Sequence, residues 1–155
     1  MTMLRRFGLI IAVLAAWAPF AHLLELPNKL RLDGPLWLAV QQQLYRGWGP
    51  LLGGPAEIAA LLTTLALLIW RWRHPVERNL TILAAAAYGA MLAVFFLAND
   101  PVNKAVASWT AGDLPSDWPR YRLLWEAGHA LAALLSAVAL AALWDAWRRE
   151  RIVQS

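Results

Sequence analysis

Two short motifs in the sequence combine a histidine with a glutamate three residues away. His22 precedes Glu25 near the N-terminus, and Glu126 precedes His129 near the C-terminus. A separation of three residues places both side chains of a motif on the same face of a helix. Glu57 lies between the two motifs in the sequence. Imidazole and carboxylate groups in this pattern are typical of two kinds of chemistry, general acid–base catalysis and metal binding.

The acid–base interpretation takes His22, Glu25, Glu126 and His129 as the candidate catalytic residues. An imidazole suits proton transfer at neutral pH because its unperturbed pKa is about 6.5. Aromatic side chains such as Trp125, one turn before His129, would form walls that hold a flat organic ligand. This interpretation needs no cofactor, and its partner is a small hydrophobic aromatic molecule.

The metal interpretation uses the same residues as ligands. In bundle dimetal sites, Glu-x-x-His motifs and single glutamates project inward from neighbouring helices. The alternative metal ligands are His22, Glu25, Glu57, Glu126 and His129. Such sites expect four carboxylates, whereas this sequence offers three, and its first motif runs in the opposite order. We therefore predict no metal, with this ligand set as the alternative.

The elements that must position these residues are predicted to be membrane-spanning helices. Hydrophobic residues make up 60% of the 155 residues and charged residues only 15%, against about 25% charged in soluble domains. A helix needs about 20 mostly apolar residues to cross a bilayer. The predicted spans are about 7–26, 55–73, 78–98 and 121–147. The sequence thus predicts an all-α, integral membrane, four-helix up-down bundle formed by a single domain, 1–155.

The first apolar stretch also resembles a signal peptide, because Arg5 and Arg6 precede it. No clean small-x-small cleavage site follows Ala21, and the stretch is long enough to span the membrane. We therefore interpret it as a retained helix.

Charge distribution predicts the orientation of the bundle. Eight of the 14 basic residues fall on the side of the two termini, which the positive-inside rule assigns to the cytoplasm. We expect a bacterial inner membrane protein with both termini cytoplasmic and tryptophans, among them Trp37 and Trp118, at the membrane interfaces. The basic residues lie at membrane edges rather than in one patch, so membrane lipid is an expected partner and nucleic acid is not.

The predicted connections are unequal in length. A tight turn at His74-Pro75 joins the second and third spans, since proline favours the first turn of a helix. In the first outer loop, Trp37, Val40, Leu44 and Trp48 recur at helical spacing, which predicts a short amphipathic helix at the interface. An irregular aromatic-rich loop is the alternative. The second outer connection, between the third and fourth spans, is predicted to be a long loop.

Polar residues of all four predicted helices are expected to meet at the outer end of the bundle. They are His22, Glu25, Glu57, Asn99, Glu126 and His129. Ionisable residues within a membrane bundle face its interior and indicate a functional site. We expect His22 and His129 to share a cavity beneath the outer loops, with Glu57 at its wall and Trp118 or Trp125 lining it. At the inner end, charged residues are expected only at the helix tips.

A resemblance to a known family adds to this interpretation. The series Pro101-Val-Asn103, Trp109, Asp117-Trp118, Arg122, Trp125 and His129 resembles the anthrone oxygenase family of small four-helix membrane proteins. That resemblance implies oxidation of an anthrone-like substrate by O2 without metal or flavin. It also implies that Asn103, Trp118 and Arg122 line the substrate pocket together with His129, which would be the base. One departure is Ala130-Leu-Ala-Ala133, where the family often has an arginine.

Two further interpretations remain open. The polar cluster can instead be structural, in a non-catalytic membrane subunit or small-molecule binder, with Arg122 and Glu126 forming an i,i+4 ion pair. Transport is less favoured, because four helices without an inverted repeat leave little room for a midplane site.

Overall fold

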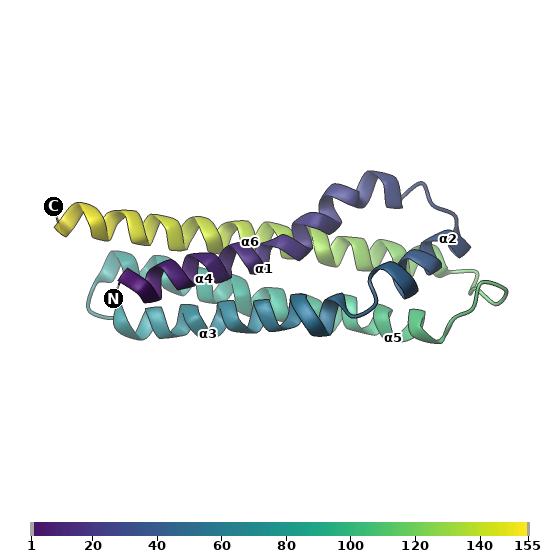
Figure 1. Cartoon of the computed structure of the whole chain (residues 1–155), viewed down its shortest axis with the longest axis horizontal. Helices are drawn as coiled ribbons and strands as arrows, with labels where there is room; N and C mark the ends of the chain where they lie inside the picture. The colour runs from purple at the N-terminus through teal and green to yellow at the C-terminus, as the bar shows by residue number, and fades with distance from the viewer. Residues whose placement is uncertain (1, 155) are drawn as a thin grey trace.

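The computed structural model describes the backbone of residues 2–154 and the side chains of residues 3–149. This part of the chain is helical, without β-strands. Its long helices are α1 (Thr2–Lys29), α3 (Gly54–Trp70), α4 (Pro75–Val94) and α6 (Trp118–Gln154). They lie side by side along one axis, and the described ends of α1 and α6 lie at the same end of the molecule (Figure 1). Because α1 packs on α3 and α6, and α4 packs on the same two helices, the four form a closed ring.

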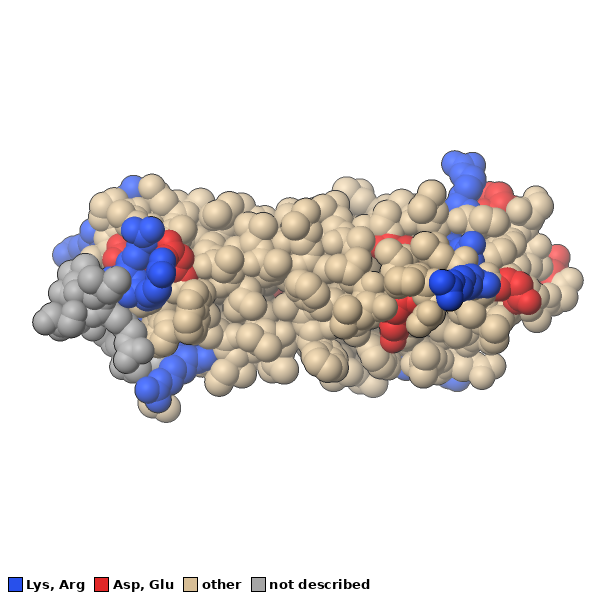
Figure 2. All heavy atoms as spheres, turned by 90° about the horizontal axis from the view of Figure 1, so that it is seen from above, with Lys and Arg blue, Asp and Glu red and all other residues tan. Residues whose placement is uncertain are grey.

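Four helical stretches of the described chain are long and apolar enough to cross a membrane. They are Met3–Lys29, Gly49–Trp70, Pro75–Ser108 and Trp118–Arg149. Large apolar side chains such as Ile10, Leu62 and Leu134 point outward, as expected for surfaces that face lipid. Figure 2 shows Lys, Arg, Asp and Glu gathered toward the two ends of the visible face, with a band of other residues between them. This distribution supports a membrane location for the bundle.

Small residues form much of the core between the long helices. Buried alanines from all four of them, including Ala12, Ala60, Ala84 and Ala139, pack around Tyr88. Small side chains let helices approach closely, which is the common mode of packing in membranes. The helices are therefore held close along most of their length.

The helices extend further than predicted at the end of the bundle opposite the two termini, which is called the outer end here, with the inner end being the one near the termini. α1 continues past residue 26 to Lys29, and the π-helical segment η2 (Gly49–Gly53) lengthens the second span. α4 continues through η3 (Phe95–Asn99) into α5 (Asp100–Ser108), so only residues 109–117 of the second outer connection lie outside a helix. The prediction of a long loop there was wrong, because Pro101 sits in the first turn of α5, where proline is compatible with a helix.

The first outer connection folds back over the bundle as α2 (Gly34–Ala39) and η1 (Val40–Leu44). The Asp33 side chain caps α2 by accepting a hydrogen bond of 2.9 Å from the Leu36 amide. The predicted short helix is therefore present. Trp37 is fully buried in a cluster with Val102, Val106 and Trp125, so its expected place in an interfacial belt was wrong.

Hydrogen bonds join this connection to α5. Gln42 Nε2 donates to the backbone oxygens of Val106, at 2.8 Å, and Trp109, at 3.0 Å. Both outer segments are thereby pinned over the same end of the bundle.

Two arginines at helix tips of the inner end are buried. Arg5 lies 4.3 Å from the ring centre of Trp70, and buried Arg71 donates to Thr81 Oγ1 at 3.2 Å. Arg5 lies in the first turn of α1 and Arg71 directly follows α3, so both are at helix tips, as expected, while their burial was not predicted. The turn at His74-Pro75 is as predicted, since α3 ends at Trp70 and α4 begins at Pro75.

Candidate functional site

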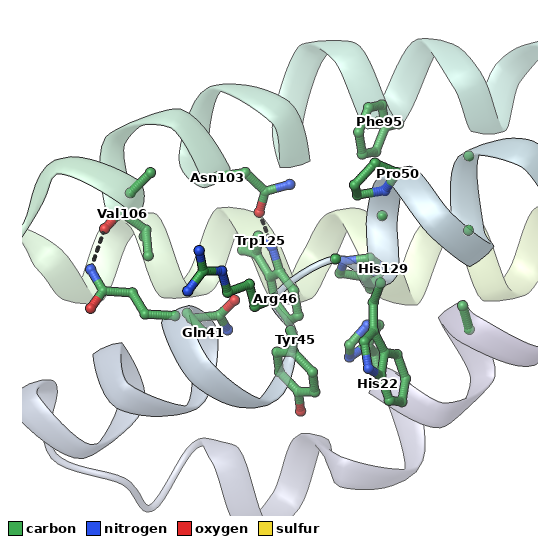
Figure 3. A pocket seen from close by; sticks show the side chains of 18 of the residues that line it. His22, Gln41, Tyr45, Arg46, Pro50, Phe95, Asn103, Val106, Trp125 and His129 are labelled. Carbon is green, nitrogen blue, oxygen red and sulfur yellow. Dashed lines mark hydrogen bonds between the residues drawn. The ribbon is translucent and has the colours of Figure 1, made fainter.

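A cavity of about 670 Å³ lies at the outer end of the bundle (Figure 3). It is lined from several elements: Ala18, Pro19 and His22 of α1; Gln41 and Gln42 of η1; Tyr45, Arg46 and Trp48 of the following turn; Pro50 and Gly53 of η2; Glu57 of α3; Phe95 of η3; Asn103, Val106 and Ala107 of α5; Trp109; and Trp125 and His129 of α6. The cavity thus draws on all four long stretches and on the connection that folds over them.

The two predicted histidines meet at the wall of this cavity. The ring centres of His22 and His129 are 4.2 Å apart. The ring centre of Trp125 lies 4.2 Å from that of His129 and 4.8 Å from that of His22. The ring centre of Tyr45 lies 4.7 Å from that of His22. Glu57 also lines the cavity. The sequence-based expectation therefore agrees with the structure for the placement of both histidines, Glu57 and Trp125, while their roles remain predictions.

The predicted catalytic glutamates do not line the cavity. Lys29 Nζ lies 2.8 Å from Glu126 Oε2 and 3.9 Å from Glu25 Oε2. Lys29 and Glu126 are buried. The ion pair between Glu126 and Arg122, which the structural interpretation predicted, is not formed. Glu126 pairs instead with Lys29, which follows Glu25 by one helical turn. Lys29 Nζ also lies 4.7 Å from the ring centre of Trp125, which lines the cavity. The ion pairs of Lys29 with Glu25 and Glu126, called the charged network below, therefore lie behind this aromatic wall of the cavity.

Tyr45 joins the network to the cavity. Its hydroxyl donates to Glu25 Oε2 at 2.5 Å, and its ring lines the cavity. Burial and, to a smaller extent, the hydrogen bond to Glu25 raise the pKa of Tyr45 above its ordinary value. The phenol is therefore a stable donor to Glu25 Oε2, which also lies 3.6 Å from His22 Nδ1 and 3.9 Å from Lys29 Nζ.

Arg122 and Trp118 do not line the cavity, so the structure does not bring them together with His129 and Asn103 as the resemblance implied. Arg122 donates to the backbone oxygens of Leu32, at 2.8 Å, and Lys29, at 3.4 Å. Its guanidinium group lies 4.7 Å from the ring centre of Trp118, which packs against Trp37 at 5.9 Å. Arg122 thereby joins the end of α1 to α6, because the last carbonyl groups of a helix need hydrogen-bond donors from outside that helix.

The two predicted asparagines have different positions. Asn99, expected among the polar residues of the site, does not line the cavity but is buried and donates to the Trp125 backbone oxygen at 2.9 Å. Asn103 lines the cavity, and its Oδ1 accepts a hydrogen bond of 2.9 Å from Trp125 Nε1. Trp125 is therefore held at its backbone and at its ring.

Gly128 makes the contact with Asn99 possible. A Cβ atom at this position would collide with the Asn99 side chain. The glycine lets the end of η3 approach α6 closely enough for the amide to reach the Trp125 carbonyl.

The residues proposed as metal ligands do not gather around a common point. Among the described residues, no three His, Asp or Glu side chains form a group that could hold a metal ion. Lys29 occupies the space between Glu25 and Glu126. The alternative ligand set therefore has no geometric support in the described part of the chain.

Sequence reasoning missed Lys29, Gln41, Tyr45 and Arg46. A signal existed for Lys29, since it follows Glu25 by four residues and so shares its face of the helix. For the other three no signal was present, because their approach to the cavity depends on how the first outer connection folds back. The π-helical segments η1, η2 and η3 all contribute to the cavity lining, and such segments are frequent at functional sites.

Comparison of the chain with family models, curated proteins and solved structures finds no match.

Proposed function

We propose that the outer cavity binds a flat aromatic molecule and that the protein oxidises this molecule with O2, using His129 as the base. The observation that carries the proposal is the His22–His129 pair, 4.2 Å apart, at the wall of a cavity that Trp125 and Tyr45 also line. The aromatic rings offer flat faces against which a planar ligand can stack. The likeness of the Asn103 to His129 region to anthrone oxygenases supports the same reaction.

The proposed reaction oxidises a methylene group to a ketone. His129 removes a proton from an activated CH2 group that is conjugated to a carbonyl, which leaves a resonance-stabilised carbanion. The carbanion transfers electrons to O2 and forms a C–O bond, and protonation gives a hydroperoxide. Loss of water from that hydroperoxide leaves the ketone, so one oxygen atom enters the product and the other leaves as water. Because O2 is the oxidant, the proposed sequence uses no cofactor.

Asn103 is the proposed donor to the developing enolate oxygen. Its Oδ1 accepts from Trp125 Nε1, which leaves the two Nδ2 hydrogens for an oxygen atom of the ligand. A donor held in place before the reaction stabilises developing negative charge. Arg122 is not a donor to this oxygen in the proposal, since it binds backbone oxygens at and beyond the end of α1.

Oxygen uptake by the purified full chain with a model anthrone tests the proposal. We expect O2 consumption matched one to one by quinone formation, followed by absorbance. His129→Gln should lower the rate by a factor of about 10² to 10⁴, the usual contribution of a general base. His74→Gln is the matched control, since His74 is exposed in the inner turn. Uptake no faster than background, or equal uptake by His129→Gln, contradicts the proposal.

A second candidate is a binder or membrane subunit without catalytic activity. The buried pair of Lys29 and Glu126 favours it, because two of the four predicted catalytic residues, Glu25 and Glu126, contact Lys29 and do not line the cavity. In that case a model anthrone quenches the tryptophan fluorescence of the protein without any O2 uptake. Quenching of the fluorescence together with O2 uptake would instead support the proposed oxidation of the anthrone.

We further propose that the chain is an up-down bundle in the bacterial inner membrane, with both termini in the cytoplasm. The four apolar stretches and the excess of basic residues on the side of the termini support this topology. Topology reporters fused after Ser155 and inserted at Gly112 test it. We expect signals from opposite sides of the membrane, and identical signals would contradict the proposed topology.

A further inference from the structure

The two ends of the cavity differ in chemistry. Pro50 and Phe95 lie at the same end as His22 and His129, whereas Gln41, Arg46 and Asn103 lie toward the other end, and Trp125 stands between (Figure 3). The polar end is the one nearer the start of α6 and so nearer the outer surface. The polar end offers the N–H donors of Arg46, Gln41 and Asn103, whereas at the other end the two imidazole rings lie beside Pro50 and Phe95. A ligand that fills both ends therefore needs an acceptor group at the polar end and a ring system at the other.

Arg46 supplies a positive charge at the polar end. Its side chain lines the cavity and is exposed. The ion pairs between described residues in the outer half use Lys29, Lys104 and, when it is protonated, His22. No described carboxylate pairs with Arg46, so its guanidinium group can bind an anion from outside the chain. A guanidinium group is well suited to this, because its planar donors match the oxygen atoms of carboxylate and phosphate groups.

Gln41 supplies a second donor at the same end. Its Nε2 is buried and has no hydrogen-bond partner among the described residues, although the residue lines the cavity. The neighbouring Gln42 differs, since its Nε2 donates to the backbone oxygens of Val106 and Trp109. A buried donor without an acceptor destabilises a protein. Gln42 is therefore part of the framework, whereas Gln41 has a donor that an acceptor atom of a ligand can satisfy.

We propose that the ligand of this cavity is an aromatic acid whose anionic oxygen atoms bind Arg46 and Gln41. This inference rests on the proposed function and deepens it by naming the class of substrate. With the anionic group held at the polar end, the ring system extends past Trp125 to the His22–His129 pair. The charge would thus select one end-to-end orientation of a flat ligand and present the same carbon to His129 in every binding event.

Binding of two matched probes to the full chain in uncharged maltoside micelles tests the inference. The probes are anthracene-2-carboxylate and anthracene-2-carboxamide, which differ in charge and little in size, and tryptophan quenching measures their Kd. We expect the wild type to bind the carboxylate at least tenfold more tightly than the amide. Arg46→Gln should weaken carboxylate binding by about tenfold or more and change amide binding by less than about twofold, because only the anion loses a charge-assisted contact.

Two further variants sharpen the test. Gln41→Glu places a carboxylate at the polar end and should also weaken binding of the carboxylate probe while sparing the amide. Arg31→Gln is the matched control, because it removes the same charge from an exposed residue that does not line the cavity. It should leave both Kd values unchanged.

The outcomes separate this inference from the proposed function. Equal affinities of the wild type for the two probes, or equal losses for both in Arg46→Gln, overturn the aromatic-acid ligand even if O2 uptake with an anthrone persists. Failure of both probes to bind overturns the inference and the binding step of the proposed function together. A third arm adds phosphatidylglycerol to the micelles. If this lipid displaces the carboxylate at equal concentration, the anion site belongs to a lipid headgroup and the aromatic-acid assignment is wrong.

Discussion

The ammonium group of Lys29 lies 2.8 Å from Oε2 of Glu126, and both side chains are almost completely buried. This pair joins the outer end of α1 to α6 directly behind the aromatic wall of the cavity. Desolvation of two charges is costly, and their attraction offsets that cost only while both are present.

Lys29→Met should therefore destabilise the protein by about 3–5 kcal/mol, since it leaves the Glu126 carboxylate buried without its partner. Combining Lys29→Met with Glu126→Leu should recover most of this loss, because no buried charge remains. Unfolding in mixed micelles, followed by circular dichroism, measures both changes. Lys104→Met is the control, since Lys104 pairs with Asp100 while 76% of its side chain is exposed, and exposed pairs contribute less than about 1 kcal/mol. Equal losses of unfolding free energy in Lys29→Met and Lys104→Met would show that the buried pair contributes no more to stability than the exposed one.

Gly128→Ala should destabilise the bundle, because the added methyl group meets the Asn99 amide. Overpacking of a tight contact costs about 1–3 kcal/mol, and here it also breaks the hydrogen bond from Asn99 to the Trp125 carbonyl. The matched control is Gly89→Ala, a helical position where a Cβ atom meets nothing within 4 Å. That change should be neutral or slightly stabilising, since alanine is the better helix former. The same unfolding experiment compares the two variants, and a neutral Gly128→Ala would be inconsistent with the close approach.

Tyr45 should make the stability of the protein depend on pH in the alkaline range. Its pKa in the folded protein is raised above the ordinary value of 10.0 by burial and by the hydrogen bond to Glu25. A group with a raised folded pKa contributes stability that is complete below the unfolded pKa and is lost as pH rises through the folded pKa. Wild-type protein should therefore lose stability above about pH 10 by up to about 1.4 kcal/mol per pH unit from this residue.

Tyr45→Phe provides the comparison for this pH effect. The variant lacks the titrating group, so its stability should fall less steeply above pH 10, while ionisation of lysines affects both proteins alike. Parallel stability curves for the two proteins in this range would rule out a buried, hydrogen-bonded phenol at position 45.

Gln42→Leu should loosen the outer cap of the bundle. The substitution removes the hydrogen bonds to the Val106 and Trp109 carbonyls, and a typical hydrogen bond contributes about 0.5–1.5 kcal/mol to stability. Limited proteolysis within residues 109–117, which lie outside the helices, should become faster. Gln43→Leu is the control because Gln43 is exposed. Equal cleavage rates for the two variants would mean that Gln42 does not pin the cap.

Much of the bundle follows from local sequence patterns. Runs of apolar residues specify the spans, and the proline at position 75 marks the turn between the second and third spans in both the sequence and the structure. Helical periodicity also places His22 and His129 on faces that can meet, since residues three or four apart share one side of a helix. The element bounds were less predictable, because Pro101 in the first turn of α5 looks in the sequence like a loop residue.

The composition and spacing of the residues by themselves determined that this chain forms apolar helices with a polar outer end, because hydrophobicity and helical period are local properties. Only the tertiary structure decided that Lys29, not Arg122, pairs with Glu126. It also decided that the connection after α1 folds inward to bring Gln41, Tyr45 and Arg46 to the cavity. These arrangements depend on how helices pack side by side and on the burial of Trp37 against α5 and α6, and contacts between distant segments have no signature in the sequence of either segment alone.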